Sequence, residues 1–170
     1  MKKLSLTISV ILLTIGLGFS QAKVAYVDTE YILSKIPTYE TAKTKLDALS
    51  KGWEKEIDAK YADVEKKYKS YQAEQSMLSA QMKKQMEDEI IALEKTADDL
   101  KEKYFGNEGD LYKKRQELVK PIQDEVFTAI KNVATEGNYG FIFDKSSGAI
   151  MIYTDPKFDV SDEVLKKLGY

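Results

Sequence analysis

The sequence predicts a mainly α protein with a small β head, in which a long antiparallel coiled-coil hairpin projects from a β-rich oligomerisation body. Three observations lead to this prediction. Between Pro37 and Pro121, apolar residues recur at intervals of three and four, which is the heptad pattern of a coiled coil. Short β-branched and aromatic runs, typical of strands, lie outside this stretch, near its two ends. A two-helix hairpin buries a single seam, so a globular core requires a separate body.

The first 22 residues have the layout of a secretory signal peptide. Two N-terminal lysines precede an uncharged, mostly apolar run (4–19), and the small residues Ser20 and Ala22 occupy the −3 and −1 positions of a cleavage site. An uncleaved membrane anchor is the alternative, but the run is shorter than the ~20 residues that a bilayer span requires. We therefore expect residues 1–22 to be removed and a soluble mature protein to begin near Lys23 in the periplasm.

The composition excludes several classes of function. The 170 residues contain no His and no Cys, which rules out disulfides, thiol nucleophiles, imidazole general bases and Cys/His zinc sites. The sequence also lacks the glycine motifs that cradle phosphates. We therefore expect no catalytic residues, no metal, no cofactor and no use of ATP. The formal net charge is −2 and becomes −4 once the two signal lysines are removed, which argues against nucleic acid as a partner.

The segment 23–37 is expected to open the body. Its first residues, KVAYVDT, are β-branched and aromatic and indicate a short strand. The apolar residues Ile32, Leu33 and Ile36 then share one side of a short helix, which Pro37 is expected to end.

Residues 38–120 are expected to form the hairpin arm, with its tip near residues 76–80. The first apolar seam comprises Tyr39, Ala42, Leu46, Leu49, Trp53, Ile57, Tyr61, Val64, Tyr68 and Tyr71. The second seam comprises Met82, Met86, Ile90, Leu93, Ala97, Leu100, Tyr104, Leu111 and Leu118. Acid-first pairs four residues apart, such as Glu65 with Lys69, support the helices by ~0.2–0.5 kcal/mol each.

The two seams also predict how the helices face each other. In an antiparallel hairpin, facing residues have numbers with a constant sum, and pairs such as Trp53 with Tyr104 add to 157. The chain then folds back between Leu78 and Ser79, and Ser79 can cap the returning helix. A register shifted by one heptad matches the seams almost as well, but the equal heights of the prolines and glycines in the two halves favour this one.

Residues 121–170 are expected to complete the body. A helix continues past Pro121 to Gly137, with an apolar face of Ile122, Val126, Phe127, Ile130 and Val133. Two strands, 139–144 and 149–153, are expected to form a β-hairpin about the turn at 145–148. Ser161 is expected to cap a last amphipathic helix carrying Val164, Leu165 and Leu168.

Three short strands in one chain leave open sheet edges, which pairing between subunits would close. The sequence therefore predicts a symmetric oligomer held together at the head. The candidate interface residues are Val24, Tyr26, Phe141, Phe143, Ile150 and Ile152.

Over nearly the whole mature chain, the sequence resembles the Skp/OmpH family of periplasmic chaperones. The resemblance rests on KVAYVDTEYIL after the signal, on FGNEGDLYKKRQELVKPIQDEVFTAIKNVATEGNYGFIFD, and on the ending FDVSDEVLKKLG. It implies a homotrimer whose three arms enclose a cavity and hold unfolded outer-membrane proteins without ATP. Well-known relatives are basic, whereas this chain is acidic, which argues against binding to anionic membrane surfaces.

The resemblance makes the arm the place where clients would bind. Flexible methionine and amphipathic tyrosine suit a promiscuous surface. The candidate client contacts are Tyr68, Tyr71, Met77, Leu78 and Met82. Because they sit at helical spacing, Tyr68, Tyr71 and Met82 also fit the alternative of packing within the seam.

Glycines at mid-arm suggest a flexible joint. Gly52 on the outgoing helix and Gly106 and Gly109 on the returning one lie at nearly the same height, and each weakens a helix. The alternative is that they make room for Trp53 or Phe105. A structural coiled-coil spacer or adaptor of the envelope is the rival function. It would require a second apolar stripe along the arm, and the sequence predicts none.

Overall fold

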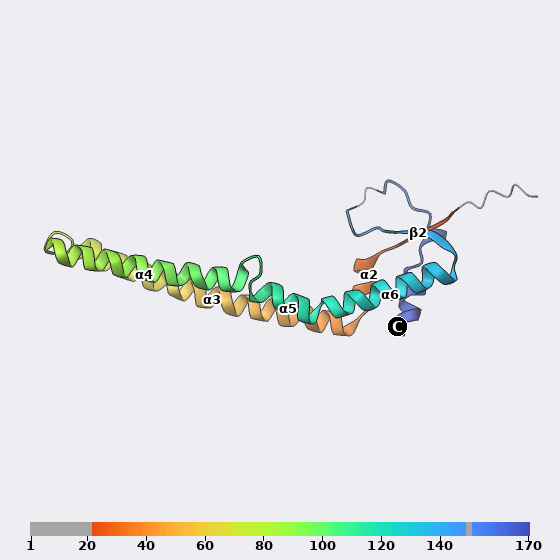
Figure 1. Ribbon diagram of the computed structural model, residues 1–170, viewed down its shortest axis with the longest axis horizontal. Coiled ribbons are helices and arrows are strands. Elements are labelled where there is room, and N and C mark those ends of the chain that lie inside the picture. Colours follow the sequence, from red (N-terminus) through yellow and green to blue (C-terminus); the bar gives the residue numbers. More distant parts are fainter. Residues whose placement is uncertain (1–21, 149–150) are drawn as a thin grey trace, which may run out of the picture.

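The chain forms a long two-helix arm that projects from a small body (Figure 1). The structure is a computed structural model, and it describes residues 22–148 and 151–170. The elements in chain order are β1 (Lys23–Val27), α2 (Thr29–Ser34), α3 (Pro37–Glu74), α4 (Ala80–Phe105), α5 (Asp110–Leu118), α6 (Lys120–Glu136), β2 (Tyr139–Asp144), the 3-10 turn η1 (Pro156–Phe158) and α7 (Ser161–Leu168). The predicted fold class, mainly α with a small β head, is confirmed.

The arm has the predicted register. Trp53 of α3 stacks on Tyr104 of α4 with ring centroids 4.9 Å apart and planes 7° apart. The chain reverses between α3 and α4, and the Ser79 side chain accepts a hydrogen bond from the Met82 backbone N–H (3.3 Å), capping α4 as expected. The seam is therefore the one in which facing residues add to 157.

Tyrosine hydroxyls join the two helices at three heights of the arm. Tyr61 donates to Asp98 (2.6 Å), Tyr104 donates to Glu56 (2.8 Å), and Tyr71 donates to Glu87. Each bond raises the pKa of its tyrosine, because the accepting carboxylate opposes the charge of a phenolate. These contacts specify which residues face each other, which a heptad repeat alone leaves open.

The returning side of the arm is broken at mid-height, whereas the outgoing side is continuous. Helix α4 ends at Phe105 with Gly106 as its C-cap, and α5 begins after Gly109. Helix α3 passes through Gly52 without interruption, and a Cβ added there would meet no atom within 4 Å. The interruption therefore lies in the returning side alone, and a weakening of α3 at Gly52 stays a prediction.

The body packs around a two-stranded parallel sheet. Strand β1 pairs with β2, with Val24 opposite Phe141 and Tyr26 opposite Phe143. One face of the sheet carries Ala25 and Val27, which are buried. With them, the core includes Ile32, Ile36, Val119, Ile122, Val126, Ala129, Val133, Val160, Val164 and Leu165. Phe127, predicted on the apolar face of α6, is instead 68% exposed.

The predicted β-hairpin of 139–144 with 149–153 is wrong in the part of the chain that the structure describes. Strand β2 pairs with β1, and Met151–Tyr153 is not a strand; residues 149 and 150 lie outside the described ranges. The Lys145 backbone N–H donates to the Val27 carbonyl (2.8 Å), so the chain leaves β2 along β1. On the edge of β1 away from β2, the backbone N–H of Val160 donates a hydrogen bond to the Tyr26 carbonyl (3.0 Å).

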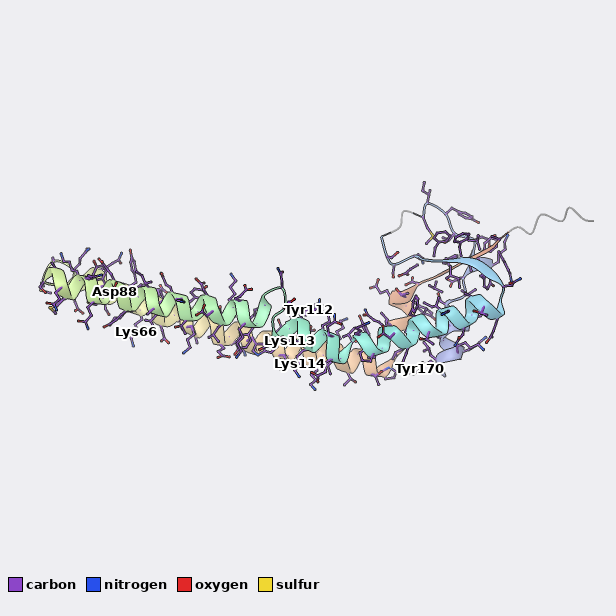
Figure 2. The ribbon with its side chains drawn as sticks, viewed as in Figure 1. Lys66, Asp88, Tyr112, Lys113, Lys114 and Tyr170 are labelled. Atoms are coloured by element: carbon purple, nitrogen blue, oxygen red, sulfur yellow. The ribbon has the colours of Figure 1, made fainter. Side chains whose placement is uncertain are left out.

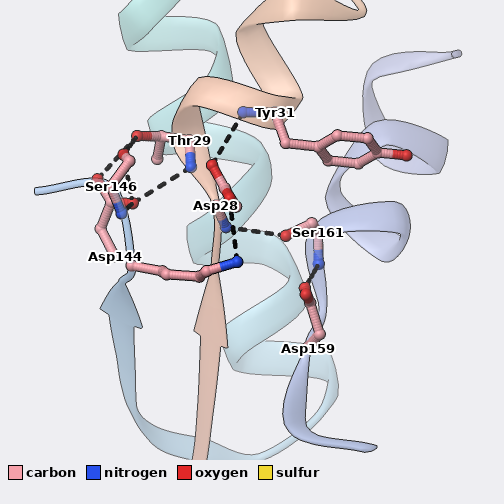
Figure 3. A network of polar contacts seen from close by, with 8 residues as sticks. Asp28, Thr29, Tyr31, Asp144, Ser146, Asp159 and Ser161 are labelled. Atoms are coloured by element: carbon pink, nitrogen blue, oxygen red, sulfur yellow. Dashed lines mark hydrogen bonds and ion pairs between the residues drawn. The ribbon is translucent and has the colours of Figure 1, made fainter. Parts of the chain in front are cut away.

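Two predicted helix boundaries are also corrected. Helix α2 ends at Ser34, and Pro37 is the first residue of α3. This position suits proline, because the first N–H of a helix has no partner within the helix. Ser161 does not cap α7 but is its buried first residue. Its hydroxyl accepts a hydrogen bond from the Asp28 backbone N–H (2.9 Å), which joins the two ends of the body (Figure 3).

Candidate functional site

Large apolar side chains are exposed at two places where the sequence predicts interaction: the outer face of the sheet and the tip of the arm. Along the rest of the arm most exposed side chains are charged, such as Lys66 on α3 and Asp88 on α4 (Figure 2), although Tyr68 and Ile91 are also exposed there.

The outer face of the sheet is apolar and largely open. Alternation along the strands puts Val24, Phe141 and Phe143 on the side away from the core, where they are 42%, 60% and 49% exposed. The two phenylalanine rings stack with centroids 6.3 Å apart. We call these three residues the open sheet face.

The segment after β2 partly covers this face. Tyr26 is buried, contrary to its prediction as an interface residue, and it lines a groove of about 270 Å³ together with Phe143, Met151, Tyr153 and Phe158. Tyr26 is therefore an internal packing residue of this chain. Ile152 is 96% exposed, and the candidate Ile150 lies outside the described residues.

The candidate client contacts near the tip fall into two groups according to their exposure to solvent. Met77 and Met82 are 80% and 52% exposed. Tyr71 is buried in the seam with Val64 and Ile90, and Leu78 packs against that cluster. The structure thus places Met77 and Met82 on the surface, whereas Tyr71 is buried and Leu78 is partly buried against the seam.

Tyr68 is the remaining candidate, and it is half exposed on the side of α3. Sequence reasoning placed both Tyr61 and Tyr68 in the buried seam and passed over Ile91, yet all three are exposed. The signal that could have found them is their spacing. Tyr61 and Tyr68 each follow a buried seam residue by four positions, and Ile91 directly follows the buried Ile90, so all three occupy flanking rather than central positions.

Several ion pairs lie on the surface of the arm. Lys69 and Glu65 form the predicted pair within α3 (2.5 Å), while Lys67 reaches across the hairpin to Glu89 (2.5 Å) instead of pairing within its own helix. The lysine hydrogen bonds lower the pKa of Glu65 and of Glu89. Exposed pairs of this kind stabilise a fold only slightly, so they contribute mainly solubility and register.

A polar network joins three parts of the body (Figure 3). The Asp144 carboxylate at the end of β2 accepts hydrogen bonds from the Thr29 hydroxyl (2.7 Å) and N–H (3.2 Å), and from the Ser146 hydroxyl (2.8 Å) and N–H (3.0 Å). Asp28 caps α2 by accepting from the Tyr31 N–H (2.9 Å). The network positions the strands and shows no reacting pair.

The described residues contain no group of three or more acidic side chains placed to hold a metal ion. None of the described helices combines the length and the apolar character that crossing a bilayer requires.

Comparisons with known proteins agree with this architecture. The model of a family described as outer membrane protein (OmpH-like) matches residues 23–168. A chaperone protein Skp of Yersinia enterocolitica is 26% identical over 147 residues, which are 86% of each chain. The crystal structure of a candidate OmpH-like outer membrane chaperone from Caulobacter crescentus CB15 is similar with a TM-score of 0.62. That match covers 89% of this chain and 86% of the other, and at 14% identity it concerns the fold alone.

Proposed function

The chain belongs to the OmpH-like family of outer membrane proteins, and from that premise we propose that it is an ATP-independent holdase chaperone of the periplasm. In this proposal three chains associate through their bodies, and unfolded outer-membrane proteins are held in the cavity between the three arms. The protein binds its clients and does not transform them.

The observation that carries the proposal is the contrast between the inside and the outside of the arm. The seam is closed by buried residues such as Val64, Tyr71 and Ile90, so the arm needs no client to fold. Its surface nevertheless exposes Met77 and Met82 at the tip. Adaptable apolar side chains on a charged rod offer weak contacts that tolerate many sequences.

The mechanism follows from multivalency. Unfolded barrel proteins carry alternating apolar residues and aggregate before they reach the membrane. Several weak contacts from three arms add up to useful affinity without tight binding at any one place. Binding only to the unfolded chain lowers its free concentration by mass action, and release needs no ATP because each contact is weak.

Export is part of the proposal. The signal-like residues 1–22 predict delivery to the periplasm, where unfolded barrels pass. Mass spectrometry of envelope protein should find a mature N-terminus at or within two residues of Lys23; a retained Met1 on a membrane-bound form would contradict this.

A dilution assay tests the function. An outer-membrane barrel protein, unfolded in urea, is diluted into buffer with or without the purified chain, and light scattering reports aggregation. We expect the chain to keep the barrel soluble at a small molar excess without ATP. Aggregation at the same rate as without the chain contradicts the holdase function. Pairing of arms end to end without binding to the barrel would support the spacer alternative.

A further inference from the structure

The two flanks of the arm, the sides on which α3 and α4 both face solvent, differ in chemistry. Contacts across the seam identify them. The Tyr61–Asp98 hydrogen bond lies on one flank. The Lys67–Glu89 ion pair lies on the other, because residues 61 and 67 stand on opposite sides of the buried line Ile57–Val64.

The flank marked by Tyr61 carries an apolar stripe. Tyr68 follows Tyr61 by one heptad and Ile91 precedes Asp98 by one heptad, so these residues lie on the same side of the arm. Tyr68 is 48% and Ile91 is 61% exposed. Toward the body, the stripe leads into a groove of about 310 Å³ that Tyr61 and Phe105 line. Tyr61 and Tyr68, which were expected in the seam, are therefore exposed beside it and belong to this flank.

The same flank is acidic. In helical projection, the carboxylates on this side of α3 and α4 are Glu54, Asp58, Glu65, Glu87, Glu94 and Asp98. Lys51, Lys84 and Lys101 are the lysines on this side. On the opposite flank, between Gly52 and Glu74, the outgoing helix presents Lys60 and Lys67 beside Glu56 and Asp63, so its charges are mixed, and it has no exposed large apolar side chain.

We propose that this aromatic and acidic flank is the surface on which the arm binds extended client segments that carry lysine or arginine among their apolar residues. The apolar stripe supplies burial for the client's apolar side chains. The carboxylates attract its cations, and Tyr68 offers a ring face to them. The occupant is thus identified by charge complementarity, and the inference rests on the holdase function proposed above.

Peptide binding tests the chemistry directly. Two unstructured fluorescent peptides of equal length share the same alternating apolar residues and carry either lysine or glutamate between them. Fluorescence anisotropy should show that the wild-type protein binds the lysine peptide about tenfold more tightly, a preference that added salt reduces. Equal or tighter binding of the glutamate peptide overturns the inference.

Paired variants test the location. Asp58→Asn with Glu94→Gln removes two charges from this flank and should shrink the preference for lysine. Asp63→Asn with Asp99→Asn removes two exposed charges that lie off this flank and should leave the preference unchanged. A similar loss in both pairs would show that only the net charge matters and would overturn the inference.

The apolar stripe has its own matched pair. Tyr68→Ser with Ile91→Ser should weaken binding of both peptides, and Met82→Ser, an exposed apolar residue off this flank, should weaken it less. Circular dichroism confirms that each variant is folded. If wild-type protein keeps an unfolded barrel soluble and the Tyr68/Ile91 pair does so equally well, the flank inference fails while the holdase function stands. If wild-type protein fails in that assay, the holdase function fails, and the client assignment with it.

Discussion

Asp144 is the residue on which the geometry of the body depends most directly. Its four hydrogen bonds tie the end of β2 to Thr29 at the start of α2 and to the turn at Ser146. Burial raises the pKa of this carboxyl, but the hydrogen bonds from Thr29 and Ser146 outweigh burial, and the pKa lies below its ordinary value of 3.8. The charged carboxylate is therefore the form that the fold prefers.

Replacing Asp144 by Asn should lower the free energy of unfolding by about 2 kcal/mol, since an amide oxygen cannot accept all four bonds. Because the pKa is depressed in the folded state, the contribution of Asp144 is present above pH 3.8 and is lost as the pH falls through the folded pKa. Thermal melts as a function of pH should therefore show a shallower acid limb in the variant. Asp88→Asn is the control, because Asp88 pairs with Lys84 at the surface (3.4 Å) and should contribute little. Equal losses in both variants would contradict this role for Asp144.

The same residue explains why sequence reasoning misplaced the sheet. The strand 139–144 was predictable from its residues, but its partner was not, because a short alternating strand suits either neighbour. The choice depends on contacts between residues more than 100 positions apart, such as Thr29 with Asp144. The predicted cap at Ser161 fails for a similar reason: its hydroxyl accepts a hydrogen bond from the backbone N–H of Asp28, more than 100 residues away, instead of capping its own helix.

Among the elements, the arm was the easiest to predict and the surface of the arm the hardest. The heptad repeat of apolar residues predicts both the helices and the seam between them. The contact of Trp53 with Tyr104 could therefore be predicted from the constant sum of facing residue numbers. Exposure is a weaker signal, since Tyr71 in the centre of the seam and Tyr68 beside it have the same residue type and similar spacing. Only the structure distinguishes the two: Tyr71 lies on the line of buried residues, and Tyr68 lies beside it and is exposed.

The returning helix is broken at the height where α3 is continuous, so Gly52 and Gly106 should respond in opposite ways to alanine. Gly52→Ala should stabilise the arm by about 1 kcal/mol, because α3 is regular there and a Cβ meets nothing within 4 Å. Gly106→Ala should destabilise it, because the added Cβ would clash with the backbone oxygen and the side chain of Glu102. Chemical denaturation measures both effects.

Spin labels at the arm tips test whether the joint is used. If the loop between α4 and α5 lets the arm bend, Gly52→Ala should narrow the distribution of distances between tips by stiffening α3 at the same height. An unchanged width would leave the glycines as packing and capping residues.

At the scale of the whole molecule, the proposed trimer needs an association surface, and the body offers a more concentrated one than the arm does. The arm's large apolar residues are either sealed in its seam or spread along its tip and flank. The open sheet face, in contrast, concentrates Val24, Phe141 and Phe143 on one small surface, with the exposed Ile152 close by in sequence. Contiguous exposed apolar residues of this kind mark association surfaces. We therefore expect the trimer to form through the body, which leaves the arms free.

Phe143→Asp should convert the oligomer into monomers. The side chain is half exposed in the isolated chain, so a carboxylate there is tolerated by the monomer but is costly when buried between subunits. Light scattering after size exclusion measures the mass, and circular dichroism distinguishes a folded monomer from an unfolded chain. Lys66→Asp and Lys101→Asp, on the exposed arm, are controls that should leave the oligomer intact. A folded variant that keeps the wild-type mass would place the interface elsewhere, and a monomeric wild type would remove the cavity altogether. The arms would then have to act singly, and the avidity of three weak surfaces could not explain how a client is held.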